Sequence, residues 1–263
     1  MKLHRIIALF MRHIYLYRRS LPRLMEIFYW PFLDLLLWGF ISLYLVRYGK
    51  NLPNFVAFLL GALILWDILF RSQQGISVSF LEDIWARNFL NIFASPLKPA
   101  EYIASLMLVS TVKIIIAGVI MSILAWLLYS FNIFVLGISL LPFILSLVIL
   151  GWAIGIVTTS LILRFGQQAE VLAWGIAFLF QPVSAVFYPV SVLPPALQAI
   201  AKYIPSSHVF EGMREIITTG RFPGQELAWS FGLNAIFIGI AFAYFYQIMK
   251  TVKKRGLLAK IGE

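Results

Sequence analysis

The side chains that could do chemistry are few in this 263-residue sequence, and they lie far apart. The three histidines, His4, His13 and His208, do not have the spacing of metal ligands. Cysteine is absent, so disulfides, thiolate metal sites and cysteine nucleophiles are excluded. The sequence contains no glycine-rich phosphate loop of the GxxxxGK[ST] type and no HExxH or GxSxG motif. We therefore expect no catalytic, metal or cofactor site within this chain.

The composition is that of a membrane protein. Hydrophobic residues make up 61% of the chain and charged residues only 12%, with a mean hydropathy of +0.90. A soluble domain has about 25% charged residues. The net charge of +10 comes from basic residues that flank long apolar runs. This is the pattern of the positive-inside rule, and it does not indicate nucleic-acid binding.

The apolar runs predict an all-α polytopic membrane protein that folds as one transmembrane domain over residues 1–263. The uncharged run from Ile114 to Leu163 is far longer than the roughly 20 residues of one span. It therefore predicts two spans, with a turn near Ser130 to Asn132. No leader peptide that would be cleaved is expected, because the first long apolar run lacks the features of one. The six predicted spans are 27–46, 55–70, 105–131, 133–163, 171–192 and 227–249.

The distribution of basic residues predicts the orientation of these spans. With both termini inside, sixteen of the 21 Lys and Arg residues lie inside and five outside. We therefore expect a multi-pass protein of a prokaryotic plasma (inner) membrane, with both termini in the cytoplasm.

Residues 1–23 predict an amphipathic interfacial helix. Apolar residues recur at helical spacing, while Arg5, Arg12 and Arg19 repeat every seven residues on another face. Two interpretations stay open. The helix lies in the inner headgroup layer with its cations facing anionic lipid, or the segment is a basic flank that sets topology.

Three ionisable residues are predicted at membrane depth, where charges are rare and commonly functional. Asp67 precedes Arg71 by one helical turn, which favours an ion pair that anchors the helix near the inner interface. Lys113 is close enough to a span end to extend its ammonium towards the interface. Asp34 is the best candidate for a functional buried charge, and a pair with Lys113 across two spans is one option.

The loop between the second and third spans predicts an amphipathic helix over residues 80–96. Acidic residues open it, Asp83 and Arg87 have the spacing of an i,i+4 ion pair, and Ser95–Pro96 ends it. Its apolar stripe must be covered. Pattern alone leaves two covers open, the bilayer interface or the groove of a soluble partner.

The segment from Phe180 to Arg221 is apolar but contains five prolines, which exclude a single straight helix. Within a bilayer such a broken backbone is tolerated only where protein or a water-filled cavity satisfies its polar groups. We expect it to face outward and to gate a path across the membrane.

Two stretches of the sequence resemble those of a known family. The run Leu90-Asn91-Ile92-Phe93-Ala94-Ser95-Pro96-Leu97-Lys98-Pro99-Ala100-Glu101-Tyr102 looks like the first coupling helix of type-2 ABC exporter permeases. Phe187-Tyr188-Pro189-Val190-Ser191 and Leu193-Pro194, followed by Ile204-Pro205 and Gly212-Met213-Arg214, resemble the outward signature of the same family. The resemblance covers essentially the whole chain.

The resemblance implies a pore formed by a homodimer, or less often by a heterodimer, and driven by a separate cytoplasmic ATP-binding subunit that holds ATP and Mg. The residues implied in coupling to that ATPase are Glu82, Asp83, Trp85, Arg87, Phe89, Phe93, Ser95 and Pro96. The resemblance also implies two short re-entrant helices, 194–203 and 206–217, within an external gate over 193–221. The gate residues are Phe187, Tyr188, Pro189, Pro194, Pro205, Glu211 and Arg214.

The function implied is ATP-driven export of an amphipathic, lipid-linked, glycan or drug-like substrate, by a subunit that is not itself an enzyme. Two alternatives stay open at this stage. One is a channel or carrier that does not use ATP, and the other is a membrane enzyme or scaffold that transports nothing. Binding of an ATPase that carries a Walker motif would separate these alternatives from export.

Overall fold

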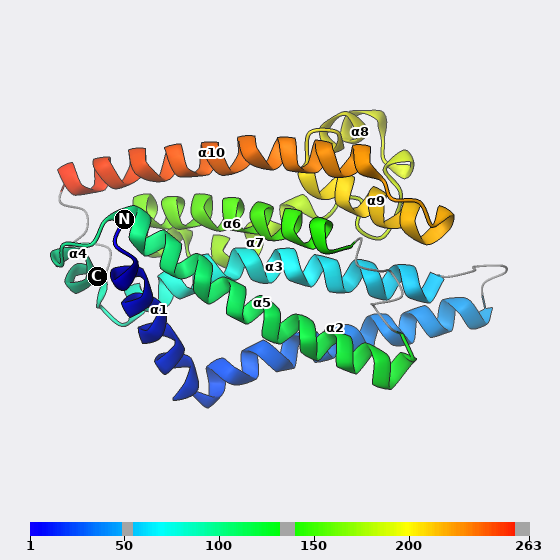
Figure 1. The fold of residues 1–263 in the computed structure, drawn as a ribbon, viewed down its shortest axis with the longest axis horizontal. Helices are drawn as coiled ribbons and strands as arrows, with labels where there is room; N and C mark the ends of the chain where they lie inside the picture. The colour runs from blue at the N-terminus through cyan, green and yellow to red at the C-terminus, as the bar shows by residue number, and fades with distance from the viewer. Residues whose placement is uncertain (49–54, 132–139, 256–263) are drawn as a thin grey trace.

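The computed structural model describes residues 1–48, 55–131 and 140–255 of the chain, and within these ranges the regular elements are all helices. Figure 1 shows that the long helices run side by side along one axis. The α-helices are α1 (Leu3–Arg18), α2 (Leu21–Tyr48), α3 (Phe55–Trp85), α4 (Phe89–Ala94), α5 (Pro99–Tyr129), α6 (Leu140–Phe165), α7 (Leu172–Phe180), α8 (Pro195–Ala201), α9 (Pro205–Thr219) and α10 (Gly224–Lys254). Two short 3₁₀ turns, η2 (Gly166–Ala169) and η3 (Val190–Val192), flank α7 and its following loop.

The two ends of the bundle differ in what they carry. At one end lie α1, α4, the start of α5 and the end of α10 (Figure 1). At the other end lie α8 and α9. We call these the inner and the outer end, after the orientation that the basic residues predict. The predicted coupling helix therefore lies at the inner end, and the predicted re-entrant helices lie at the outer end.

Four of the described helices are long and apolar enough to cross a membrane, and they are α2, α5, α6 and α10. Helices α2 and α10 contain the predicted spans 27–46 and 227–249, and α5 covers the predicted span 105–131 except for its last two residues. Residues 133–139, the start of the predicted span 133–163, lie outside the described residues. The bundle is thus a multi-pass membrane protein, while the count of six spans stays a prediction.

The predicted fifth span differs most from the structure. Its helix, α7, has nine residues and ends at Phe180. At a rise of 1.5 Å per residue this is about 14 Å, roughly half of a hydrocarbon core. Pro182 removes a backbone donor just beyond the end, and turns and bends follow up to Pro189.

The predicted helix over 80–96 is wrong as a single element. Helix α3 continues to Trp85, and the chain then turns at Arg87, whose φ of 51° is left-handed. The Arg87 and Asn88 N–H groups donate to the carbonyls of Ile84 and Asp83 and so close the helix end. A short α4 follows. The turn uses arginine where glycine is the usual residue, so the sequence carried no signal for it.

The core of the bundle is built on close contact between α3 and α6. A Cβ at Gly151 of α6 would overlap the Ser72 side chain and lie 2.6 Å from the Leu69 carbonyl oxygen. One turn further, a Cβ at Gly155 would lie 2.8 Å from the Gln73 carbonyl oxygen. These two glycines allow the α3 and α6 backbones to approach closely, as small residues four apart do in membranes.

We expect Gly151→Leu to separate α3 from α6 and to lower the thermal stability of the detergent-solubilised chain, because overpacking costs about 1–3 kcal/mol or more. The matched control is Gly239→Leu on α10, where a Cβ would meet no atom within 4 Å. Size-exclusion chromatography after heating measures both variants. Equal melting temperatures for the two would show that α3 and α6 do not depend on this contact.

Candidate functional site

Three carboxylates lie together at the inner end, two on the last turn of α3 and one on the first turn of α5. Asp83 is fully buried. Its Oδ1 accepts a hydrogen bond from the Arg12 guanidinium at 2.7 Å, and its Oδ2 accepts one from the Tyr102 hydroxyl at 2.8 Å. The His13 ring, also buried, places Nε2 3.5 Å from Oδ2. Asp83 thus joins α1, α3 and α5.

The other two carboxylates also bind the N-terminal part of the chain. Glu82 accepts hydrogen bonds from the Tyr17 hydroxyl at 3.0 Å and pairs with Nε of Arg23 at 3.1 Å. Glu101 accepts the backbone N–H groups of Lys2 at 2.7 Å and Lys98 at 3.0 Å.

Helix α1 is therefore attached to the bundle through buried charge. Arg5 pairs with Glu101 at 3.5 Å, and Arg12 with Asp83. Arg5 and Arg12 are thus directed at carboxylates of the bundle, whereas Arg19 is exposed, and contact of this helix with lipid headgroups stays a prediction. The predicted ion pair between Asp83 and Arg87 is also wrong, because Asp83 points into the bundle and Arg87 points out.

The electrostatics of this cluster keep Asp83 ionised. Burial alone would raise the pKa of Asp83, but the His13 ring, the Arg12 guanidinium and the Tyr102 O–H together hold the pKa below its usual range. Burial, followed by the nearby Glu82 carboxylate, raises the pKa of the Tyr17 hydroxyl, so that Tyr17 stays a neutral donor.

The predicted coupling residues divide into a buried and an exposed set. Glu82, Asp83 and Phe89 are buried, and Phe93 is partly buried. Trp85, which is 50% exposed, Arg87, Ser95 and Pro96 are at the surface of the inner end. Trp85 also donates its indole N–H to Glu170 at 3.0 Å and stacks on Trp174, so that it joins the end of α3 to α7.

Aromatic rings fasten α4 to its neighbours. The Phe89 ring lies 5.2 Å from the Phe80 ring of α3, and the Phe93 ring lies 5.4 Å from the Tyr102 ring of α5. The Lys253 ammonium near the end of α10 lies 5.7 Å from the centre of the Phe93 ring. A displacement of α4 would therefore reach α3, α5 and α10 through direct contacts.

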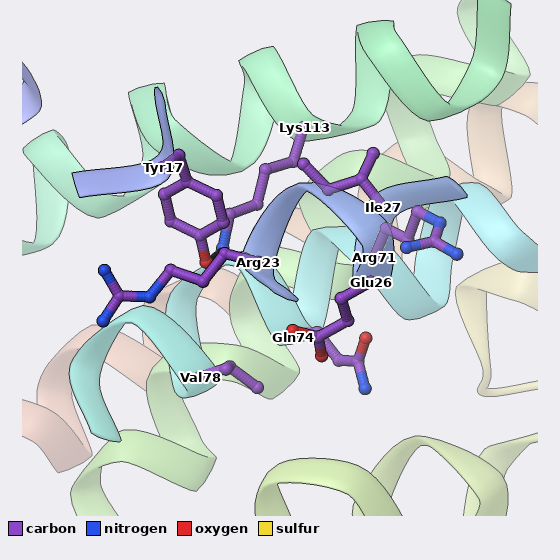
Figure 2. A pocket seen from close by; sticks show the side chains of 9 residues that line it. Tyr17, Arg23, Glu26, Ile27, Arg71, Gln74, Val78 and Lys113 are labelled. Atoms are coloured by element: carbon purple, nitrogen blue, oxygen red, sulfur yellow. Dashed lines mark hydrogen bonds between the residues drawn. The ribbon is translucent and has the colours of Figure 1, made fainter. Parts of the chain in front are cut away.

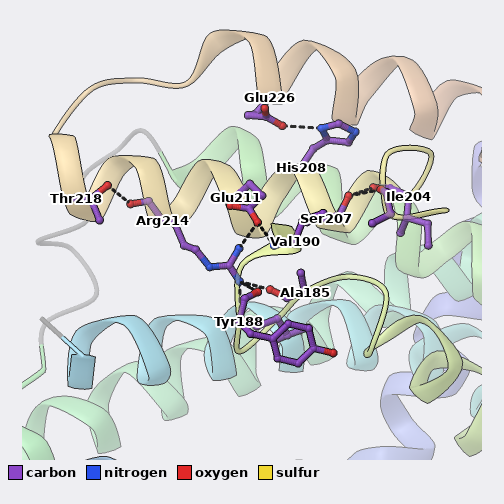
Figure 3. A network of polar contacts seen from close by, with 12 residues as sticks. Ala185, Tyr188, Val190, Ile204, Ser207, His208, Glu211, Arg214, Thr218 and Glu226 are labelled. Atoms are coloured by element: carbon purple, nitrogen blue, oxygen red, sulfur yellow. Dashed lines mark hydrogen bonds and ion pairs between the residues drawn. The ribbon is translucent and has the colours of Figure 1, made fainter. Parts of the chain in front are cut away.

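At the outer end, Arg214 and Glu211 on α9 hold the loop that follows α7 (Figure 3). The Arg214 guanidinium donates to the carbonyls of Ala185 and Tyr188, the latter at 2.5 Å, and pairs with Glu211 at 2.9 Å. Glu211 in turn accepts the N–H of Val190 at 2.6 Å. These bonds give hydrogen-bond partners to the backbone carbonyls of the turn at Ala185, where the φ of 52° is left-handed.

The remaining predicted gate residues shape the same region. Phe187 stacks on Trp38 of α2, with ring centres 4.6 Å apart. The Tyr188 hydroxyl donates to the carbonyl of Pro182 at 2.7 Å. Pro189, Pro194 and Pro205 lie at element starts: Pro189 before η3, Pro194 before α8, and Pro205 as the first residue of α9. Beside them, the His208 ring lies between Glu226 and the Lys202 carbonyl.

The predicted intramembrane charges have separate environments. The ion pair between Asp67 and Arg71 is confirmed at 2.7 Å. Lys113 donates to the Tyr17 hydroxyl and to the Ser79 hydroxyl at 3.1 Å. No ion pair joins Lys113 to Asp34 in the part of the chain that the structure describes. Asp34 lies on an exposed part of α2.

Sequence reasoning missed the partners of the inner carboxylates. Arg12, Tyr17, Arg23, Glu101 and Tyr102 were not predicted to form one network with them. The seven-residue spacing of Arg5 and Arg12 was the available signal, since it places both on one side of α1. Their partners lie 71 or more positions along the chain, and only the fold brings them together.

Comparison with known protein families identifies the family to which this sequence is similar. Residues 38–246 match a family described as ABC-2 family transporter protein. The match runs from the middle of α2 into α10, and it confirms the resemblance stated above. No curated protein matches the chain.

We expect Asp83→Asn to loosen α1 from the bundle, because it leaves Arg12 and His13 facing a neutral group. The loss should fall toward the lower end of the roughly 3–5 kcal/mol typical of broken buried pairs, because Arg12 is partly exposed. The depressed pKa makes the contribution of Asp83 complete above about pH 4 and removes it only as the pH falls through the lower folded value.

Wild type should therefore be more stable to heat than Asp83→Asn at both about pH 8 and about pH 5, because Asp83 is ionised at both. The exposed Glu215 on α9 supplies the matched control, Glu215→Gln. An Asp83→Asn protein as stable as this control would contradict the attachment of α1 through Asp83.

Proposed function

The chain belongs to the ABC-2 family of transporter proteins, and on that basis we propose that it exports an amphipathic, lipid-linked, glycan or drug-like substrate. As a member of this family it is a membrane permease subunit of an ABC transporter, without a nucleotide site of its own. Its partner is an ATP-binding subunit. The observation that carries the proposal is the presence of a surface helix fixed to the bundle at the inner end and a loop held by α9 at the outer end.

The proposed contact with the ATPase is the exposed face of α4 and its flanking turns. Arg87, Asn91, Ala94 and Ser95 lie on this face, while Phe89 and Ile92 pack inward. The apolar side of α4 is covered by α3 and α5, so its small polar outer side is the part that can contact a soluble protein. The buried Glu82 and Asp83 act behind this surface by fastening α1 and α3, and the ATPase would not touch them.

The proposed gate is the loop between α7 and α9, together with α8. Between Gln181 and Pro189 its backbone is not helical, so its polar groups there need partners within the protein at membrane depth. Arg214 and Glu211 supply several of them. A segment held by a limited set of side-chain contacts, and not by a continuous helix, has few bonds to break when it opens.

Helix α3 is the proposed connection between the two ends. At its inner end it carries Glu82 and Asp83. Near its outer end the Phe58 ring lies 5.2 Å from the Arg214 guanidinium carbon. A movement of α3 driven from α4 would therefore act directly on the residue that holds the gate.

We propose that two copies of the chain form the pore. The support is α2, on which many large apolar side chains are exposed along with Asp34. An isolated carboxylate facing hydrocarbon is costly, so this face is expected to be covered by protein or to line a water-filled path. The proposed location is a prokaryotic inner membrane with cytoplasmic termini, following the distribution of Lys and Arg.

We expect Ala94→Cys on α4 to crosslink to a cysteine-bearing ATPase subunit in the purified complex. The chain has no cysteine of its own, so any adduct reports the introduced position. Ala199→Cys on α8, exposed at the outer end, is the matched control and should give no adduct. Equal crosslinking of the two positions, or crosslinking of the control alone, would sink the proposed docking surface.

We expect Arg214→Gln to uncouple the transporter. Hydrogen bonds from a charged donor are worth about 1.5–3 kcal/mol each, so their loss should lower export per ATP hydrolysed by about tenfold or more. Binding of the ATPase should be unchanged. Reconstituted vesicles allow both rates to be measured, with Glu215→Gln as the control on the same helix. Unchanged export by Arg214→Gln would place the gate elsewhere.

A further inference from the structure

Two hollows of different character meet where α1 turns into α2. The first lies between this elbow, α3 and α5, and Figure 2 shows the charged side chains of Arg23, Glu26, Arg71 and Lys113 around it. The second lies between the elbow and α5, and apart from Arg18 and Lys113 its walls are apolar or aromatic, including Ile14, Leu24, Val109, Val112 and Ile116. Tyr17, Ile27 and Lys113 line both hollows. Together they form one site with a polar part and an apolar part.

The polar hollow contains two charged groups that form no ion pair among the described residues. Arg23 pairs with Glu82, and Arg71 pairs with Asp67. Among the described residues, the Lys113 ammonium has hydroxyl partners but no carboxylate, and the Glu26 carboxylate has neither an ion pair nor a hydrogen bond. An ammonium has three donors, of which the Tyr17 and Ser79 hydroxyls take two. One donor of the Lys113 ammonium and the Glu26 carboxylate therefore remain as hydrogen-bonding groups for a ligand.

A ligand that matches this arrangement carries both signs of charge and an apolar chain. A phosphodiester suits the Lys113 ammonium, with Arg23 nearby, and a primary ammonium suits Glu26. The apolar hollow along α5 suits an acyl chain, because burial of hydrocarbon is favourable in proportion to its area. The Tyr17 ring lies 4.2 Å from the Lys113 ammonium and keeps it at the boundary of the two parts.

The position of the site agrees with this chemistry. Helix α1 is amphipathic and leads into α2, one of the helices long enough to cross the membrane. The elbow between an interfacial helix and a span lies at the depth of lipid headgroups. A ligand at this depth would come from the bilayer itself and would be a lipid.

We propose that the α1–α2 elbow binds one phospholipid with a phosphoethanolamine headgroup, with the phosphate at Lys113 and Arg23 and the amine at Glu26. The acyl chain lies against Val109, Val112 and Ile116. The proposal requires only that the chain is embedded in a membrane. It does not depend on the ATPase or on export, and its failure would leave the proposed function untouched.

Native mass spectrometry of the purified chain tests this site. Phosphatidylethanolamine and phosphatidylglycerol with identical acyl chains are added in equal amounts, and one retained lipid per chain is counted. Wild type should retain phosphatidylethanolamine in about tenfold excess, the ratio that a difference of about 1.4 kcal/mol produces. Glu26→Gln should remove or reverse the preference, and Lys113→Gln should reduce retention of both lipids.

Two further measurements guard against variants that fail to fold. Ile116→Trp fills the apolar hollow from a half-exposed position and leaves the charges in place, so it should lower retention of phosphatidylethanolamine. Glycerophosphoethanolamine, which has the headgroup without the chains, should not displace the lipid at equal concentration. Lys202→Gln at the outer end is the control and should behave as wild type.

Equal retention of the two lipids by wild type, an unchanged preference in Glu26→Gln, or displacement by the chain-free headgroup would each overturn the proposal.

Discussion

The burial of Asp83 is the constraint on which the inner end of this protein depends. A carboxylate without solvent is stable only if cations and donors surround it. Arg12 and His13 from α1 and Tyr102 from α5 supply this environment for a residue of α3. Without α1 the charge would lack its two cationic neighbours, and without α5 it would lack the Tyr102 donor. The N-terminal helix is therefore as much a part of the bundle as the long helices, although it precedes the part of the chain that matches the family.

From this cluster, α3 extends the length of the bundle and meets the proposed gate. Its middle is held against α6 by the close approach at Gly151 and Gly155, and its outer part carries Phe58 beneath Arg214. Tightly packed interiors transmit displacement because they cannot be compressed. A helix that is fixed by charge at one end and contacts the gate at the other can couple events at the two membrane surfaces. The aromatic contacts between α4 and its neighbours would transmit a movement of α4 to α3.

The sequence predicted those features that depend on local pattern. The apolar runs indicated the long helices, the spacing of Asp67 and Arg71 indicated their ion pair, and the prolines after Phe180 indicated a broken segment. What it did not predict depends on distant partners. The Asp83 carboxylate seemed to match Arg87 four residues on, but its partner Arg12 lies 71 positions away. The helix breaks at Arg87, whose backbone is in the left-handed conformation, and no glycine or proline in the sequence indicated this break.

The central claim is that nucleotide binding by the partner ATPase, which contacts the inner end, changes the conformation of the outer end of this chain. The most direct measurement places spin labels at Arg47 on α2 and Ala199 on α8, two exposed residues, in a chain that has no native cysteine. The labelled chain is diluted with unlabelled copies, assembled with its ATPase and measured by pulsed electron resonance, with and without ATP trapped. The account predicts that the distance distribution between the labels shifts when ATP is trapped. An identical distribution in both states, in a complex that hydrolyses ATP, would contradict it.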